Sequence, residues 1–313
     1  MKREMFEPVD LDRVRTTPLK GRKSRVALSD LARTPRKGAS FREFEKSLPG
    51  LLAVREMRAL ADAVARAARA RKTVLWMIGA HVIKAGLSPV LIELMRCRAL
   101  TALAMNGAGA IHDYEMAACG KTSEDVARGL KDGSFGMAGE TGVFLNRAAQ
   151  LGKSVGFGKA LGSTIAIARL PHRDISLLHE ALRNDLPATV HVAIGTDIVH
   201  MHPTADGAAI GAASFTDFRR LCSVAGTLEG GVVINAGSAV LLPEAFLKAL
   251  NVARNLSNRV RRFTAANLDM IQHYRPNVNV VERPTALGGR GISLTGHHEI
   301  MIPLLAQSVI ERL

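Results

Sequence analysis

Residues whose side chains could carry chemistry follow short apolar runs of this chain. His81 and Lys84 come just after the run 73–78, and Asp197 and Asp206 come after the run 189–194. A carboxylate can hold a cationic amine, and a histidine can accept or release a proton near neutral pH. Lys84 lies in an otherwise apolar stretch, where loss of water favours the neutral amine and therefore imine formation. These residue types together indicate chemistry on a small, positively charged substrate.

The apolar runs predict a sheet whose strands are buried and parallel. Each run is short, rich in β-branched residues and bounded by turn residues. We expect strands at 73–78, 100–105, 189–194 and 231–234, and two more before Asn267 and before Glu282-Arg283. Segments with helical periodicity alternate with them, at 55–71, 87–98, 122–130, 140–151, 175–183, 216–225 and 243–254. The alternation predicts a doubly wound α/β fold with a mostly parallel sheet and helices on both faces, which gathers ligand-binding residues where its strands end.

Charge divides the chain into two parts. Residues 1–72 hold 19 Lys or Arg and 9 Asp or Glu, which gives them +10 of the total net charge of +14. We expect a basic, partly extended arm over residues 1–50 and a single domain over 51–313. The arm has almost no aromatic side chains that could stack on bases, so we expect it to lie across a neighbouring subunit or an acidic substrate path and not on nucleic acid.

Neither a targeting segment nor a membrane span is expected. The first residues lack the apolar centre of a signal peptide. No apolar run reaches the length of about 20 residues that crosses a bilayer. We therefore expect a cytoplasmic protein without a membrane partner.

Of two glycine-rich segments, one predicts a ligand-binding loop and the other predicts close helix packing. Asn106-Gly107-Ala108-Gly109 follows an expected strand and would bring backbone N–H groups close to a ligand such as a nucleotide phosphate. It lacks the three spaced glycines of the full dinucleotide fingerprint. The run 152–162 follows no strand, and its small residues recur at helical spacing, so we expect close helix packing there.

Several segments resemble the deoxyhypusine synthase family in order and spacing. The stretches IGAHVIKAG (78–86) and LAMNGAGAIHDY (103–114) are similar to two of its nucleotide-binding loops. Residues 186–190 and 203–211 resemble the region of its Asp-Gly loop, and 231–238 its glycine-rich strand end. The resemblance covers roughly residues 40–300. It implies a Rossmann-like fold, an NAD site, a homotetramer with active sites between subunits, and an N-terminal segment that can cover a neighbour's site.

Two departures from this family bear on the reaction. The family's catalytic Trp-Gly-Lys motif is missing from the corresponding region, 287–299, and Leu241-Leu242-Pro243-Glu244 stands where a histidine pair is expected. The loop from Asn106 to Asp113 is also similar to that of ornithine-deaminating domains. We therefore expect an NAD-binding enzyme that acts on a small cationic amine or amino acid, by aminoalkyl transfer or oxidative deamination, and that does not make deoxyhypusine.

Candidate roles follow for individual residues. We expect Lys84, His81 and Asp206 to be catalytic, and His202, Asp206 and His297 to bind substrate. The expected contacts of NAD are Gly79, Asn106, Gly107, Gly109, Asp113, Asp197, Gly237 and Ser238.

Two alternatives belong to other functional classes. A metal-dependent lyase or hydrolase would use His191, His200 and His202, whose spacing is not a strong zinc signature. A non-catalytic nucleotide- or RNA-binding module would use the basic arm. The main hypothesis includes neither a metal nor a nucleic-acid partner.

Overall fold

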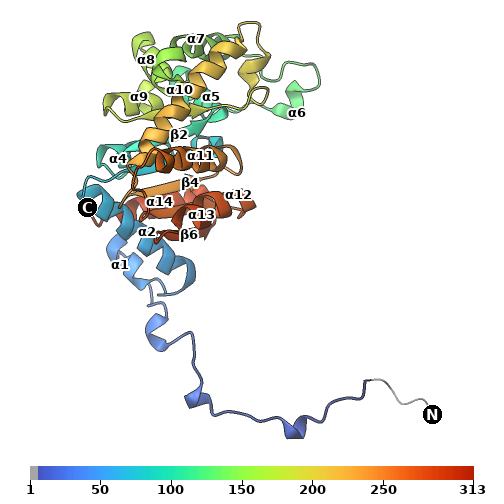
Figure 1. Ribbon diagram of the computed structural model, residues 1–313, viewed down its shortest axis with the longest axis vertical. Coiled ribbons are helices and arrows are strands. Elements are labelled where there is room, and N and C mark those ends of the chain that lie inside the picture. The colour runs from blue at the N-terminus through green and yellow to red at the C-terminus, as the bar shows by residue number, and fades with distance from the viewer. Residues whose placement is uncertain (1–5) are drawn as a thin grey trace, which may run out of the picture.

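A computed structural model describes residues 6–313, and residues 1–5 of the expected arm lie outside the described residues. Six parallel strands form one sheet in the order β3-β2-β1-β4-β5-β6 (Figure 1). The strands are β1 (Val74–Ile78), β2 (Ala102–Asn106), β3 (Ala188–His191), β4 (Val232–Ala236), β5 (Thr264–Asp269) and β6 (Arg290–Thr295). The doubly wound, Rossmann-like α/β fold expected from the sequence is therefore confirmed.

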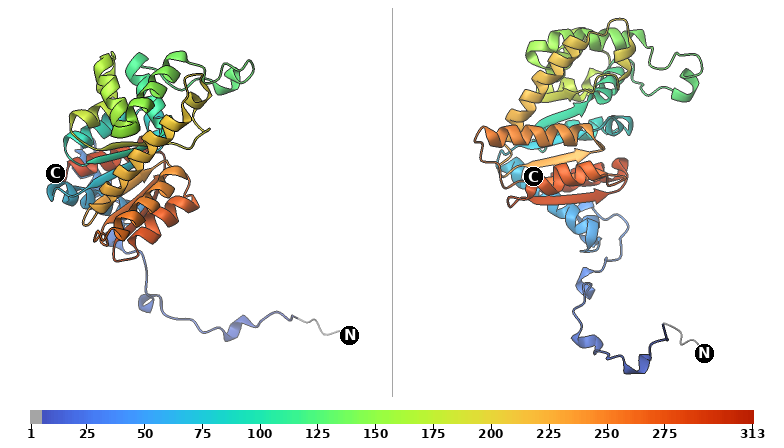
Figure 2. Two further views of the ribbon diagram at one scale, coloured as in Figure 1. Left: turned by 45° about the horizontal axis from the view of Figure 1, so that its top comes forward. Right: turned by 45° about the vertical axis from the view of Figure 1, so that its right-hand side comes forward.

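Helices cover both faces of the sheet, because side chains of each strand alternate between two apolar layers. Trp76 and Ile78 pack in one layer, and Leu75 and Met77 pack in the other. The first layer includes residues of α2 (Leu52–Arg69), α3 (Ala80–Lys84), α4 (Ser88–Arg96), α5 (Gly107–Cys119), α7 (Gly139–Val155), α8 (Phe157–Ala168), α9 (Leu177–Arg183) and α14 (His298–Ile310). The second is covered by α10 (Gly207–Gly226) and α11 (Leu241–Asn255) (Figure 2). Over residues 6–313, no helix has both the length and the apolarity needed to cross a bilayer.

Two segments differ from the prediction. The run before Glu282-Arg283 is not a strand: α12 (Tyr274–Pro276), the π-helix η6 (Asn277–Glu282) and α13 (Arg283–Thr285) follow one another there. The sixth strand is β6, an edge strand in which only Ile292 and Leu294 are buried, so it lacks the continuous apolar run of the inner strands. The helix expected at 122–130 is reduced to α6 (Val126–Gly129), since Ser123 has a left-handed φ of 70° that a helix cannot contain.

The glycines of the run 152–162 allow helices to touch backbone. A Cβ on Gly158 would overlap the carbonyl oxygen of Ala188 in β3, and one on Gly162 would overlap that of Leu178 in α9. Close packing, as expected from the spacing of small residues, is confirmed for this run.

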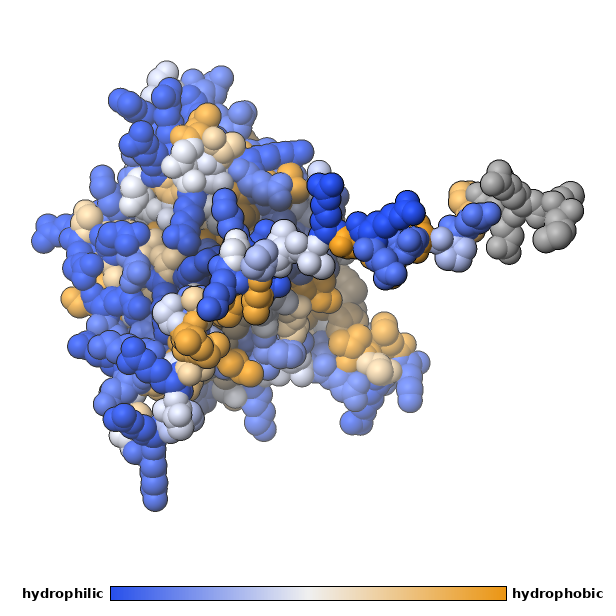
Figure 3. Space-filling model, turned by 90° about the horizontal axis from the view of Figure 1, so that it is seen from below, coloured by the Kyte–Doolittle hydropathy of each residue, from blue (hydrophilic) through white to orange (hydrophobic). Residues whose placement is uncertain are grey.

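The N-terminal arm leaves the domain as an extended chain (Figure 1). From residue 6 to Gly38 it contains only the 3-10 turns η1 (Leu11–Arg13), η2 (Leu19–Gly21) and η3 (Leu28–Asp30). Its surface is mostly hydrophilic with separate apolar side chains, as seen from below the domain (Figure 3). The next helix, α1 (Phe41–Ser47), is held against the end of the chain, where Arg312 contacts Glu45 at 2.8 Å. Before α1, the Gly50 N–H donates to the Asp30 carbonyl oxygen at 2.9 Å, and the Arg33 N–H donates to the Ser47 carbonyl oxygen at 2.8 Å. The described arm therefore extends away from the domain from residue 6 to about Ser29.

Replacing Gly158 by Ala should lower the free energy of unfolding by roughly 1–3 kcal/mol, because the added methyl group forces α8 away from β3. Gly211→Ala is the matched control within α10, where a Cβ meets no atom within 4 Å. It should raise the free energy of unfolding by about 0.5–1 kcal/mol, since Ala loses less backbone entropy in a helix. Urea denaturation of both variants checks this, and equal stabilities would contradict the close contact.

Candidate functional site

The candidate site lies at the carboxyl edge of the sheet. In this strand order the connections leave in opposite directions from β1 and β4, and ligands bind in the crevice at such a switch point. Gly79 follows β1, Asn106 ends β2, and Gly237 and Ser238 follow β4. The strand ends therefore bring these predicted residues to one edge.

A cavity of about 570 Å³ opens at this edge beside β2. Its walls come from α3, from one face of α5 and from the loops at 121–126, 135–138 and 196–198. The charged or titratable side chains in its lining are Lys84, His112, Glu115, Lys121, Glu124 and Asp197. The volume is within the range of pockets for small molecules. Of the residues predicted from sequence, Lys84 and Asp197 meet in this cavity.

A chain of hydrogen bonds joins His112 to Glu115 in the cavity. The Thr122 hydroxyl donates to Glu115 Oε2 and lies 2.6 Å from His112 Nδ1. Because the hydroxyl has one proton and gives it to Glu115, Nδ1 of His112 must be the donor to Thr122. Thr141 donates to the other oxygen of Glu115 at 3.1 Å. Glu115 is thus fixed by two hydroxyls, and His112 Nε2 keeps a lone pair.

The imidazole of His112 is neutral at physiological pH. Burial lowers its pKa to about 4, and the nearby Lys84 ammonium lowers it further in the same direction. The cavity therefore places a neutral histidine among two lysines, Lys84 and Lys121, and three acidic side chains, Glu115, Glu124 and Asp197.

Asp197 joins the loop after β3 to the start of α5. Its Oδ2 occupies the place that a Cβ on Gly107 would take, so only glycine at 107 lets the carboxylate approach. Burial raises the pKa of Asp197 to about 6, and a hydrogen bond from the Ala108 N–H partly opposes that rise. At the same helix start, Asn106 Oδ1 accepts from the Gly109 N–H at 2.9 Å. Side chains of the protein therefore already hold the N–H groups that a phosphate could use.

Two histidines lie together at the switch point. The rings of His81 and His298 are 5.8 Å apart. His298 Nε2 is 3.1 Å from the Leu268 carbonyl oxygen, while its buried Nδ1 has no hydrogen-bond partner among the described residues. Gly237 has a φ of 70°, and its absent side chain leaves room for His298. A Cβ on Gly79 would overlap the Gly237 carbonyl oxygen, so β1 and β4 end in backbone contact.

Four predicted residues lie elsewhere. Asp113 is buried and accepts from the Ser176 hydroxyl at 2.6 Å and from the Leu177 N–H at 2.7 Å, so it caps α9. The other three occupy separate places. His202 lies 2.7 Å from the Gly136 carbonyl oxygen, behind the cavity wall, and Asp206 caps α10 by accepting from the Ala209 N–H. His297 is exposed beside Glu299, while the adjacent His298 lies at the switch point.

The histidines of the metal alternative have separate partners. His191 Nε2 is 3.0 Å from Thr189 Oγ1, and His200 Nδ1 accepts from the N–H of Gly195 at 3.1 Å. His202 is bound to Gly136. Within residues 6–313, no group of three or more metal-ligating side chains converges.

The sequence makes His112 a possible base and Glu115 a possible carboxylate of the loop after β2 without preferring them to other candidates, and it gives His298 no separate role. A signal for the first two was present, since Ala108, His112 and Glu115 are spaced as one face of a helix that starts after β2. For His298 the pair His297-His298 gave no indication of which ring faces inward.

Comparisons with known proteins show the fold. No protein-family model matches the chain, and no curated protein matches its sequence. A structure described as a conserved LOR/SDH protein from Methanococcus maripaludis S2 has a TM-score of 0.51 at 14% identity, over 83% of this chain and 70% of that one. AgrE, solved as a ternary complex with ornithine and NAD+, has a TM-score of 0.52 at 16% identity, over 82% of this chain and 33% of AgrE. A protein described as a deoxyhypusine synthase from Entamoeba histolytica has a TM-score of 0.51 at 11% identity, over 88% of this chain and 94% of that one.

These likenesses concern the arrangement of helices and strands. The chain spans about a third of the length of AgrE, so it corresponds to one part of that protein. At such low identities the shared fold carries no assignment of individual residues.

The carboxyl group of Asp197 should make stability depend on pH in a definite direction. Its native pKa of about 6 lies above the ordinary value of 3.8, so between these values the unfolded chain has lost a proton that the native protein keeps. The free energy of unfolding therefore falls as pH rises through this window, by roughly 3 kcal/mol for a shift of this size. Asp197→Asn should remove that part of the slope in urea denaturation from about pH 4 to pH 7.

Asp132→Asn is the comparison for this measurement. A hydrogen bond from the Ser134 hydroxyl lowers the pKa of the exposed Asp132. Titration of Asp132 therefore affects the free energy of unfolding only below the pH range in which Asp197 acts. The slope of this variant should match that of the unaltered protein, and an unchanged slope in Asp197→Asn would contradict the burial argument.

Proposed function

We propose that the protein is an NAD-dependent enzyme that acts on a small cationic amine or amino acid. The observation that carries the proposal is the cavity beside β2, in which a fixed carboxylate, a neutral histidine and a lysine face one another. It lies at the edge where folds of this topology bind dinucleotides. AgrE, whose fold is similar, was crystallised with ornithine and NAD+.

The charged groups of the cavity suit an amine. Glu115 is held by Thr122 and Thr141, and with ionised Asp197 it can pair with a substrate ammonium group. Lys84 can pair with the carboxylate of an amino acid or, when neutral, form an imine with a carbonyl carbon. His112 Nε2, which keeps a lone pair, can accept a hydrogen bond from the same ammonium group. Lys84 is thus the proposed catalytic residue, and His112 and Glu115 are proposed to hold the amine.

The switch point is the proposed place for the cofactor. When bound, NAD would accept a hydride from the carbon that carries the amine. Ser238 and His81 lie at this rim, and His298 Nδ1 is a buried polar atom that a ligand group could satisfy. The space beside Gly79, Gly107 and Gly237 is already occupied by protein atoms. These glycines therefore allow close packing of the protein around the site and leave no room of their own for a ligand.

The reaction type is proposed as aminoalkyl transfer or oxidative deamination, on the resemblance of the nucleotide-binding loops. The Trp-Gly-Lys motif that carries deoxyhypusine synthesis is missing from this chain. We therefore propose ornithine-like amino acids or polyamines as the substrate class, with Lys84 as the candidate amine nucleophile.

Calorimetric titration of NAD, ornithine and spermidine into the full chain tests the proposal, with NADH formation followed by absorbance. Glu115→Gln should weaken amine binding about tenfold or more, because a charge-assisted contact is lost, and should leave NAD affinity unchanged. Glu93→Gln, on the exposed side of α4, is the control and should change neither. Absence of any NAD binding by the unaltered protein would contradict the proposal.

We also propose a homo-oligomer, a tetramer by the resemblance, in which the arm lies on a neighbouring subunit. The arm carries exposed apolar side chains, including Phe6 at 85% and Leu28 at 89% exposure, which a second copy could cover. Sedimentation velocity should give the mass of an oligomer for the full chain and a weaker assembly after deletion of residues 1–40. The mass of a single chain would contradict it.

A further inference from the structure

A second cavity, of about 910 Å³, lies at the opposite, amino edge of the sheet. It is built where the chain enters β1, β2 and β3, and where α2, α4 and α10 end. Its lining includes four cationic side chains, Arg69, Arg71, Lys72 and Arg98, and no Asp or Glu. The cavity is distinct from the carboxyl edge, because the strands separate the two.

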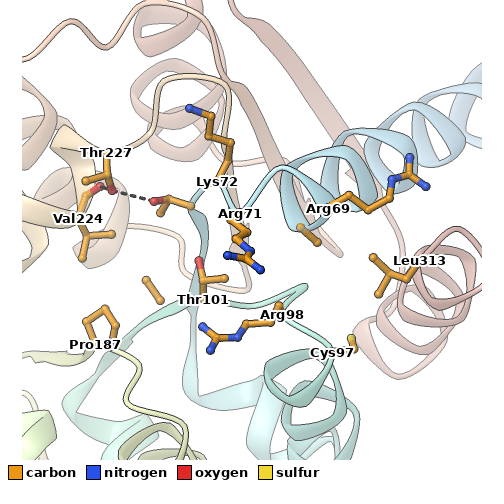
Figure 4. A pocket seen from close by; sticks show the side chains of 13 residues that line it. Arg69, Arg71, Lys72, Cys97, Arg98, Thr101, Pro187, Val224, Thr227 and Leu313 are labelled. Carbon is orange, nitrogen blue, oxygen red and sulfur yellow. Dashed lines mark hydrogen bonds between the residues drawn. The ribbon is translucent and has the colours of Figure 1, made fainter.

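The arginines at the centre of this cavity face one another. Arg71 and Arg98 point into the same space from the turns that follow α2 and α4, whereas Arg69 and Lys72 point away from it (Figure 4). Arg69 donates to the Arg312 carbonyl oxygen at 2.6 Å. None of the four forms an ion pair within residues 6–313. Two guanidinium groups thus converge without a carboxylate between them.

Helix ends explain only part of this charge. The carboxyl ends of α2, α4 and α10 each carry a partial charge of about −0.5, which favours nearby cations. Their sum is smaller than the charge of the four side chains. The remainder is positive and is available to a ligand.

The backbone conformation at Arg71 and Arg98 is one that favours glycine. Arg71 and Arg98 follow α2 and α4 with φ values of 53° and 62°, in the left-handed region where glycine is the usual residue after a helix. Arg169, after α8, has the same conformation with a φ of 51° but does not line this cavity. Because glycine suits the backbone at all three positions, replacing each arginine by glycine removes its side chain without straining the backbone.

We propose that this cavity binds a compact polyanion that carries two or more phosphate groups. Planar guanidinium groups bind phosphate oxygens in pairs, and two converging arginines match two adjacent phosphates. The hydroxyls of Thr73, Thr101 and Thr227 line the same space and can donate to phosphate oxygens. The lining contains no aromatic side chain, so the stacking surfaces typical of single-stranded nucleic-acid sites are missing from it.

Calorimetry on the full chain at about 0.15 M ionic strength tests this site with pyrophosphate, tripolyphosphate, ATP and a single-stranded RNA oligonucleotide. We expect tripolyphosphate to bind. If ATP binds as tightly as tripolyphosphate, the phosphates are the recognised group. If ATP binds more tightly than tripolyphosphate, its nucleoside also contacts the site. Arg71→Gly and Arg98→Gly should each weaken binding about tenfold or more, with Tm unchanged or raised.

Arg169→Gly is the matched control, because it removes the same charge and relieves the same backbone conformation outside the cavity. It should leave affinity within about twofold of the unaltered protein. Arg98→Gln gives the same loss of binding if the glycine variant does not fold. No phosphate binding, an equal loss in Arg169→Gly, or tighter binding of RNA than of tripolyphosphate would overturn the proposal. The binding of NAD and amines at the carboxyl edge should be unaffected by Arg98→Gly, so the two proposals fail independently.

Discussion

Three buried aspartates each hold N–H groups of an element that lies elsewhere in the chain. Asp113 of α5 caps α9, Asp197 of the loop after β3 reaches the start of α5, and Asp217 of α10 accepts from Gly158 of α8 at 2.8 Å and from Val190 of β3 at 2.8 Å. Burial raises the pKa of each of them to about 6. The hydrogen bonds that they accept offset part of the cost of desolvation. The positions of α5, α8 and α9 depend on these carboxylates, and α5 forms one wall of the cavity beside β2.

This arrangement changes what the start of α5 can do. A helix start with free N–H groups attracts anions, but here Asn106 and Asp197 already occupy it. Gly107 is needed because Asp197 is close, not because space is left for a ligand. The side chains of α5 that face the open cavity are therefore His112 and Glu115, which lie about one and two turns after the start of the helix.

The sequence predicted the parts of the fold that depend on local pattern. Buried strands such as β1 have continuous apolar runs, whereas β6 at the sheet edge alternates and was missed. Lys84 and Asp197, which line the cavity, could be named as candidates from the sequence because they come shortly after expected strands. The cap made by Asp113 could not be found, because its partners Ser176 and Leu177 are more than 60 residues away and only tertiary packing brings them together. His112 and Glu115 are within three residues of each other on one helix face, and a search by helical spacing would have reached them.

The arm that precedes α1 has a geometric consequence for assembly. An extended chain advances about 3.3 Å per residue, so the stretch from residue 6 to Ser29, before the backbone bond between Asp30 and Gly50, can span on the order of 80 Å. That reach exceeds the length of any helix in the domain. A neighbouring molecule could therefore be tethered without the two globular bodies touching, and the distance between them would be set by the tether's own flexibility.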